Sequence, residues 1–101
     1  MEIVVSRDAP AQIQAPDAFG RFAVVVEPGV GPDLQRTLEG TARTEGGTHA
    51  RVFPQAVRRL ASRANDRAWN DAFDVMLAFA VGRGWLASDS AIRAHIEVRE
   101  E

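Results

Sequence analysis

The sequence predicts an α+β fold: a small mixed or antiparallel sheet of about three strands, with three helices packed on one face. Three observations predict it: β-branched or apolar runs near the N-terminus, an alternating segment near the C-terminus, and a long apolar helical pattern between them. The chain has 101 residues and is 46% apolar, which is typical of one domain. We therefore expect a single globular domain over residues 1–101. A mostly α-helical fold is the alternative if the N-terminal segments are not strands.

Three segments have the character of strands. Residues 2–6 are rich in β-branched side chains. Residues 22–26 form a continuous apolar run between Gly20 and Pro28, which is typical of a strand buried on both faces, so we expect them in the middle of the sheet. Residues 91–98 alternate between apolar and polar side chains and predict a half-buried strand, most simply an antiparallel one.

Two other segments carry turn-forming residues. Residues 11–15 lie between Pro10 and Pro16 and are expected to form a loop or a broken edge segment. Residues 44–48 contain Gly46-Gly47, and we expect a flexible loop there.

Helices are expected over 32–42, 54–64 and 66–82. The third has the clearest pattern, because its large apolar side chains recur at helical spacing and Val75 and Phe79 widen the apolar arc beyond half of the circumference. Such a helix needs more than one neighbour to cover it. We therefore expect it to organise the core and to bury its remaining apolar surface against a second copy of the chain.

Composition restricts location and chemistry. Cysteine is absent, which excludes disulfides, thiolate metal sites and a cysteine nucleophile. The N-terminus lacks the basic start of a signal peptide, and no apolar run is long enough to span a membrane, so we expect a soluble cytoplasmic protein with no membrane partner. All 12 basic residues are arginine, a bias typical of a GC-rich bacterial genome.

No motif for catalysis, metal binding or cofactor binding is recognisable. His49 and His95 lack the spacing of metal-ligand pairs. The turn containing Gly29 and Gly31 follows a strand and precedes a helix, but it lacks the glycine pattern of a phosphate loop, and Pro32 removes a backbone donor. We therefore expect no catalytic residue, no metal and no cofactor.

A cluster of arginines is the first candidate contact surface. Between residues 51 and 67 only Asp66 opposes five cations, and a ridge of this kind suits phosphate groups or an acidic partner. The acids of the third helix argue against DNA binding, because they would face phosphate. The candidate contact residues are Arg51, Arg58, Arg59, Arg63 and Arg67.

The polar face of the last strand is the second candidate. Arg93, His95 and Glu97 share this face, where Glu97 would orient His95 for general-base chemistry or all three would contact a ligand. The alternative is a solvated strand face with cross-strand pairs. Aromatic residues and a methionine offer a nearby pocket lining, but packing in the core is the favoured explanation of the tryptophans: Trp69, Trp85, Phe73, Met76 and Phe79.

These observations favour a small non-catalytic interaction or regulatory module that binds itself as a homodimer, or binds another protein. Two alternatives stay open. One is nucleic-acid binding through the ridge from Arg51 to Arg67. The other is a small ligand-binding domain or enzyme that uses Arg93, His95 and Glu97.

Overall fold

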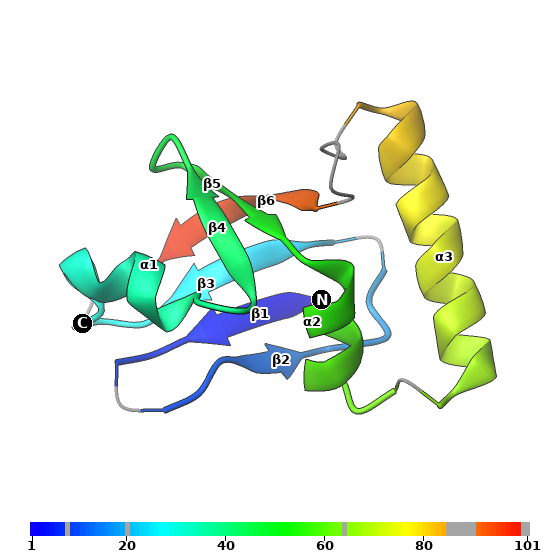
Figure 1. The fold of residues 1–101 in the computed structure, drawn as a ribbon, viewed down its shortest axis with the longest axis horizontal. Helices are drawn as coiled ribbons and strands as arrows, with labels where there is room; N and C mark the ends of the chain where they lie inside the picture. Colours follow the sequence, from blue (N-terminus) through cyan, green and yellow to red (C-terminus); the bar gives the residue numbers. More distant parts are fainter. Residues whose placement is uncertain (8, 20, 64, 85–90, 100–101) are drawn as a thin grey trace.

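The protein forms a six-stranded mixed sheet with helices on one face and at one end (Figure 1). The computed structural model describes residues 1–7, 9–19, 21–63, 65–84 and 91–99. The α+β class is confirmed, but the expected sheet of about three strands is wrong, and so is the mostly helical alternative. In chain order the elements are β1 (Glu2–Val5), β2 (Gln12–Gln14), β3 (Ala23–Val26), η1 (Gly31–Asp33), α1 (Leu34–Thr37), β4 (Ala42–Glu45), β5 (His49–Val52), α2 (Pro54–Leu60), α3 (Arg67–Gly82) and β6 (Ile92–Val98).

The strand order is β2-β1-β3-β6-β5-β4. β3 pairs in parallel with β1 and with β6, whereas the pairs β1–β2, β5–β6 and β4–β5 are antiparallel. All four residues of β3 are buried, as expected of the apolar run at the middle of the sheet. β6 has the expected alternation of burial. It is not antiparallel to both of its neighbours, however. It pairs in parallel with β3 and antiparallel with β5.

The additional strands come from segments with weak patterns. β4 and β5 form a hairpin where the sequence suggested a helix end and a flexible loop. Gly46 and Gly47 turn the chain there with φ of +65° and +79°, backbone conformations that glycine adopts without steric cost. β2 is a three-residue strand at the sheet edge, which agrees with the broken edge segment expected over 11–15.

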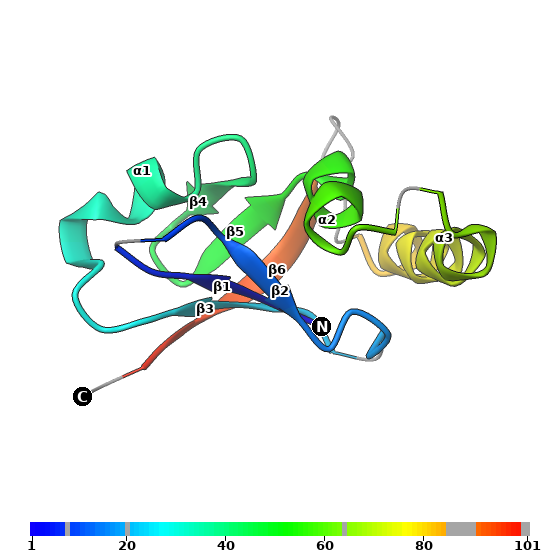
Figure 2. The ribbon, with the colours of Figure 1, turned by 90° about the horizontal axis from the view of Figure 1, so that it is seen from below.

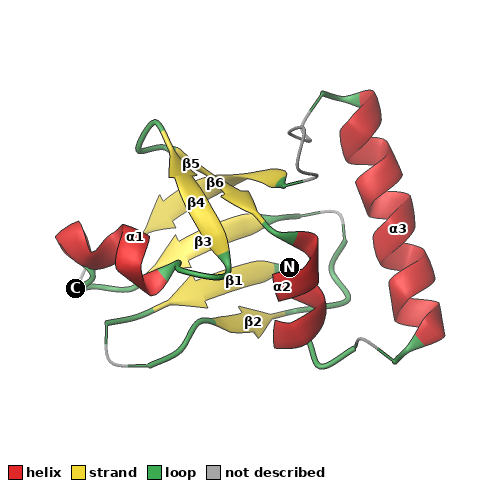
Figure 3. Ribbon diagram, in the orientation of Figure 1, coloured by secondary structure: helices red, strands yellow, loops and turns green. Residues whose placement is uncertain are grey.

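The core is built mainly from one face of the sheet. α1 and α2 lie on the same side of the sheet (Figure 2, Figure 3). Leu38, which follows α1, and Val57 of α2 join the buried cluster on that face. The strands contribute most of this cluster: Ile3, Val5, Val24, Val26, Ala42, Ala50, Val52, Ile92, Ala94 and Ile96.

α3 is continuous over Arg67–Gly82, close to the expected 66–82, but its position differs from the expectation. It stands beside the ends of the strands and does not cover a face (Figure 1, Figure 2). Trp69 and Phe73 reach the core, whereas Val75, Phe79 and Val81 are 70%, 54% and 61% exposed. The expectations that α3 organises the core and that three helices share one face are therefore wrong. Six strands already supply most of the apolar surface that the core needs.

Asp66 caps the N-terminus of α3. Its carboxylate accepts a hydrogen bond from the Trp69 backbone N–H at 3.0 Å and another from the Arg63 guanidinium at 3.1 Å. The Trp69 N–H, followed by Arg63, holds the pKa of Asp66 below its ordinary value. The carboxylate thus stabilises the fold only while it is charged.

Asp66→Asn is expected to reduce the sensitivity of the protein to acid. Because the pKa of Asp66 is lower in the folded state than in the unfolded chain, where it is about 3.9, its contribution is present above about pH 4 and is lost as the pH falls through the folded-state value. Asparagine still caps the helix but does not titrate. Urea unfolding over a pH series should therefore show a smaller loss of stability in acid for the variant. Parallel curves for the two proteins would contradict the assignment.

Candidate ligand-binding pocket

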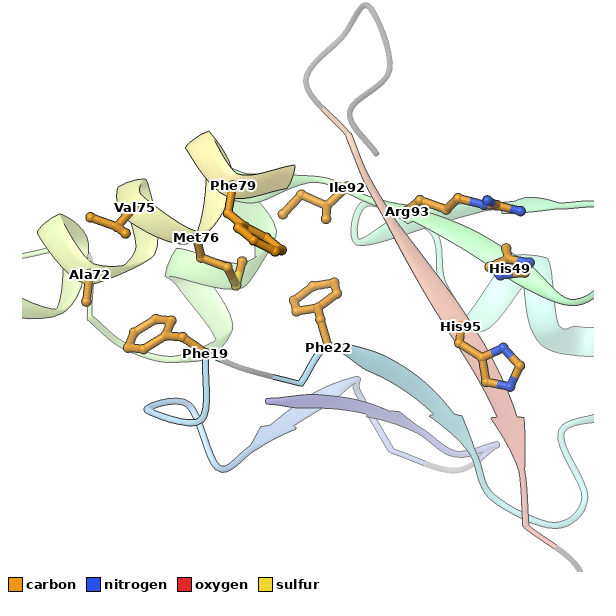
Figure 4. A pocket seen from close by; sticks show the side chains of 10 residues that line it. All are labelled: Phe19, Phe22, His49, Ala72, Val75, Met76, Phe79, Ile92, Arg93 and His95. Carbon is orange, nitrogen blue, oxygen red and sulfur yellow. The ribbon is translucent and has the colours of Figure 1, made fainter. Parts of the chain in front are cut away.

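A pocket of about 730 Å³ lies between α3, the chain before β3, and the first half of β6 (Figure 4). Its volume falls within the range of about 300–1,000 Å³ that is usual for small-molecule sites. The lining side chains belong to Phe19, Phe22, His49, Ala72, Val75, Met76, Phe79, Ile92, Arg93 and His95.

The pocket forms because β6 is longer than the strand beside it. The register places Ala23 opposite His95, so residues 92–94 of β6 extend beyond the first residue of β3. The chain before β3 is held against α3 by Trp69, whose indole N–H donates to the Pro16 carbonyl oxygen at 2.9 Å and whose ring centroid lies 5.8 Å from that of Phe19. α3 is therefore held beside the strand ends, and residues within its stretch from Ala72 to Phe79 line the pocket.

Apolar and basic side chains occupy different ends of this pocket. Apolar side chains gather on the α3 side of β6, where Phe22, Met76, Phe79 and Ile92 lie close together (Figure 4). The basic side chains lie on the β5 side of β6. The arrangement follows from strand alternation, since neighbouring residues of β6 point to opposite faces.

The two histidines meet at the basic end. His49 on β5 and His95 on β6 are cross-strand partners, and their ring centroids are 5.5 Å apart in an edge-to-face arrangement. The Thr48 hydroxyl is hydrogen-bonded to Nδ1 of His49 at 2.9 Å. This pairing was not predictable from the sequence, because it depends on a register between distant segments.

A row of arginines adjoins the histidine pair. Arg43, Arg51 and Arg93 occupy matching register positions on β4, β5 and β6, and therefore share one face of the sheet. Glu45 contacts two of them: one carboxylate oxygen accepts from Arg51 at 2.5 Å, and the other lies 3.5 Å from Arg93. We call these three arginines together with His49 and His95 the basic face. Like charges opposite one another cost stability, which makes this row of three noteworthy.

The protonation states of His49 and Glu45 follow from the charged groups around them. Desolvation lowers the pKa of His49, and the charges of Arg93 and His95 lower it further, against an opposing effect of Glu45. The Arg51 hydrogen bond lowers the pKa of Glu45. The site therefore favours a neutral His49 beside an ionised Glu45, in a positive local potential.

The proposed ligand face of the last strand is only partly assembled into this pocket. Arg93 and His95 line it, whereas Glu97 is outside the lining and accepts two hydrogen bonds from Arg21, at 3.0 and 3.2 Å. Met76 and Phe79, which the sequence suggested as pocket lining, also line this pocket.

Two other aromatic residues that the sequence suggested as pocket lining are instead packed in the core. Trp69 and Phe73 are buried there, with ring centroids 5.0 Å apart. Trp85 lies outside the described residues. Phe19 and Phe22 take the corresponding places in the pocket. Phe19 belongs to no predicted element, and Phe22 was expected in the buried strand over 22–26, whereas β3 begins at Ala23, so the sequence pattern indicated neither as pocket lining.

The arginines of the predicted ridge lie on four different parts of the fold. α2 ends at Leu60 and not near residue 64, so Arg59, Arg63 and Arg67 do not follow one another on a single helix. Arg59 is on α2, Arg63 is in the connection, Arg67 begins α3, and Arg51 belongs to β5.

Three members of this set have carboxylate partners close by, among them Arg51, which pairs with Glu45 as described above. Arg58 donates to Asp74 at 2.8 Å, and Arg63 donates to Asp66 at 3.1 Å. A role of the whole set in binding nucleic acid or a protein partner stays a prediction. Measuring DNA affinity over a salt series tests it, because phosphate contacts require a steep loss of affinity as salt rises.

Comparisons of the chain with models of known protein families, with curated proteins and with solved structures gave no match. Within the part of the chain that the structure describes, no group of three or more His, Asp or Glu side chains is arranged to hold a metal ion. Among the described helices, none has both the length and the apolar character needed to cross a bilayer.

Proposed function

We propose that this domain is a non-catalytic binding module whose ligand is a small, largely apolar molecule held in the pocket between α3 and β6. The observation that carries the proposal is the lining: seven apolar side chains from three separate parts of the chain surround one volume of about 730 Å³. Phe79 lines the pocket and is 54% exposed, with the Arg83 guanidinium 5.0 Å from its ring centroid, so a ligand that contacts the exposed part of the ring gains apolar burial.

The chemistry of the lining supports binding over catalysis. Among the described lining residues, the only candidates for proton transfer are two imidazoles. The hydroxyl of Thr48 and the carboxylate of Glu45 are near His49 but lie outside the lining. Arg93 and Glu45, two of the charged groups that act on His49, form an ion pair with each other at 3.5 Å.

Phe79→Asp is expected to weaken the binding of a neutral apolar fluorophore, N-phenylnaphthylamine, by at least about tenfold, since it removes an aromatic wall and places a charge in its position. Val81→Asp is the matched control. Val81 is on the same helix and 61% exposed, but it is not a lining residue. Fluorescence titration measures both affinities, and circular dichroism establishes that both variants are folded. Equal weakening by the two substitutions, or no binding to the wild type, would contradict the proposal.

Self-association through α3 is a second candidate. Val75 and Val81 leave 70% and 61% of their surface exposed on this helix, and apolar surface of this kind favours a second copy as its partner. Sedimentation velocity at micromolar concentration tests it: we expect a dimer for the wild type and monomer for Val81→Asp. A monomeric wild type would rule it out. We also propose that the protein is cytoplasmic and bacterial. The absence of cysteine and of lysine supports this proposal.

A further inference from the structure

We propose that the ligand is an amphipathic anion, with an apolar chain or ring among the phenylalanines on the α3 side of the pocket and an anionic group at the basic end beside Arg93. This inference rests on the proposed function, because it names the chemical class of molecule that the same pocket takes.

The charges of the basic face support an anion. Arg43, Arg51 and Arg93 stand in one row across three strands, and Glu45 is the carboxylate that contacts both Arg51 and Arg93. Among the described residues that line the pocket, Arg93 carries a full charge and no carboxylate accompanies it. Glu97, further along β6, lies outside the lining and pairs with Arg21. An anionic group accepts a hydrogen bond from a guanidinium with both partners charged, which is stronger than the bond that a neutral hydroxyl accepts, and an ammonium group has no acceptor at all.

The geometry of β6 brings the two ends of such a ligand together. Ile92 faces the apolar end, whereas Arg93 and His95 face the basic end (Figure 4). Three residues along a strand span about 10 Å, the scale of a small molecule with an extended apolar part. Residues 92–94 of β6 extend beyond β3. One molecule on the β3 side of these residues can therefore contact both the apolar and the basic side chains of the pocket.

A bound anion is expected to favour protonation of His49. Four groups near this imidazole set its charge: Arg93 and His95 from β6, Arg51 from β5, and Glu45 from β4. The cations and the desolvation keep its pKa low in the free protein. A new negative charge would raise that pKa, so the ligand should bind more tightly as the pH falls from about 7.5 to about 5.5.

Three probes with similar alkyl chains and different head groups separate apolar binding from recognition of charge. They are octanoate, octanol and octylammonium, each used below its micellar concentration. We expect octanoate to bind about fivefold more tightly than octanol, with octylammonium the weakest. Arg93→Gln should remove the preference for octanoate over octanol. Arg67→Gln, which changes a 95%-exposed arginine outside the pocket, should leave this preference unchanged. Titration followed by nuclear magnetic resonance, including the imidazole signals of both histidines, gives the affinities and the pKa of His49.

The outcomes distinguish the two proposals. If none of the three probes shifts the signals of pocket residues, the proposed function fails, and this inference fails with it. If octanol and octylammonium bind as tightly as octanoate, or if Arg93→Gln weakens all three probes equally, the pocket stands and the anion assignment is overturned. Preference for octanoate that depends on Arg93, with a raised pKa of His49 in the complex, supports both proposals.

Discussion

Replacing Phe73 with alanine is expected to destabilise the protein by about 3–5 kcal/mol, the usual cost of removing a fully buried phenylalanine ring. Phe73 has no exposed surface, its ring stacks on Trp69 with centroids 5.0 Å apart, and the Arg58 guanidinium lies 5.0 Å above it. A cavity at this position would loosen the attachment of α3 to the sheet. Because domains of this size have a total stability of only about 5–15 kcal/mol, the variant should be close to unfolding at moderate temperature.

Chemical denaturation of Phe73→Ala and the wild type measures this difference. Val75→Ala is the matched control on the same helix, because Val75 is 70% exposed, and its effect should stay within about 0.5 kcal/mol. If Phe73→Ala cost no more than this control, the assignment of Phe73 to the core would be wrong.

Arg58→Ala is expected to cost about 1–3 kcal/mol, although an arginine on a helix is usually dispensable. Arg58 connects α2 to α3. Its guanidinium donates to Asn70 Oδ1 at 3.0 Å and to Asp74 Oδ1 at 2.8 Å, and it covers the Phe73 ring with only 22% of its side chain exposed. Losing it removes these hydrogen bonds and uncovers one side of the aromatic stack.

Thermal and urea unfolding of Arg58→Ala should therefore show a clear loss of stability. Arg67→Ala provides the comparison: its side chain is 95% exposed, and its carboxylate partner Asp71 is 4.0 Å away, so a change of at most about 0.5 kcal/mol is expected. Equal stability of the two variants would mean that Arg58 is a surface residue available to a partner, as the ridge hypothesis requires.

The sequence predicted elements whose pattern is strong and local. The β-branched start, the apolar run before Pro28, the alternating last strand and the helix over 66–82 all correspond to elements of the structure. The expected helices over 32–42 and 54–64 are shorter than predicted. Gly40 and Ser62, with φ of +78° and +55°, lie in a left-handed conformation just beyond α1 and α2, which a helix cannot continue through.

What the sequence did not show is mostly non-local. β4 and β5 are four-residue strands with mixed polar and apolar side chains, and their partners are fixed by register and not by local propensity. Prediction of the candidate site from the sequence is limited in the same way. Arg93 and His95 were recognisable on the last strand, but their neighbours Arg43 and His49 reach the same face only through the pairing of β4, β5 and β6. The alternation on both sides of Gly46-Gly47 was the available signal for that hairpin.

The central place of β6 has a consequence for how the molecule forms. This strand follows all the others in the chain, yet it joins β3 to β5. Before it is in place, the earlier strands can make only two separate ribbons, β2-β1-β3 and β5-β4, each with an unpaired backbone edge that is open to other chains. Completing the sheet requires contacts between residues more than forty positions apart in sequence, such as His49 with His95, an arrangement that slows folding. Newly synthesised chains should therefore be most prone to aggregate in the interval before this closing strand inserts.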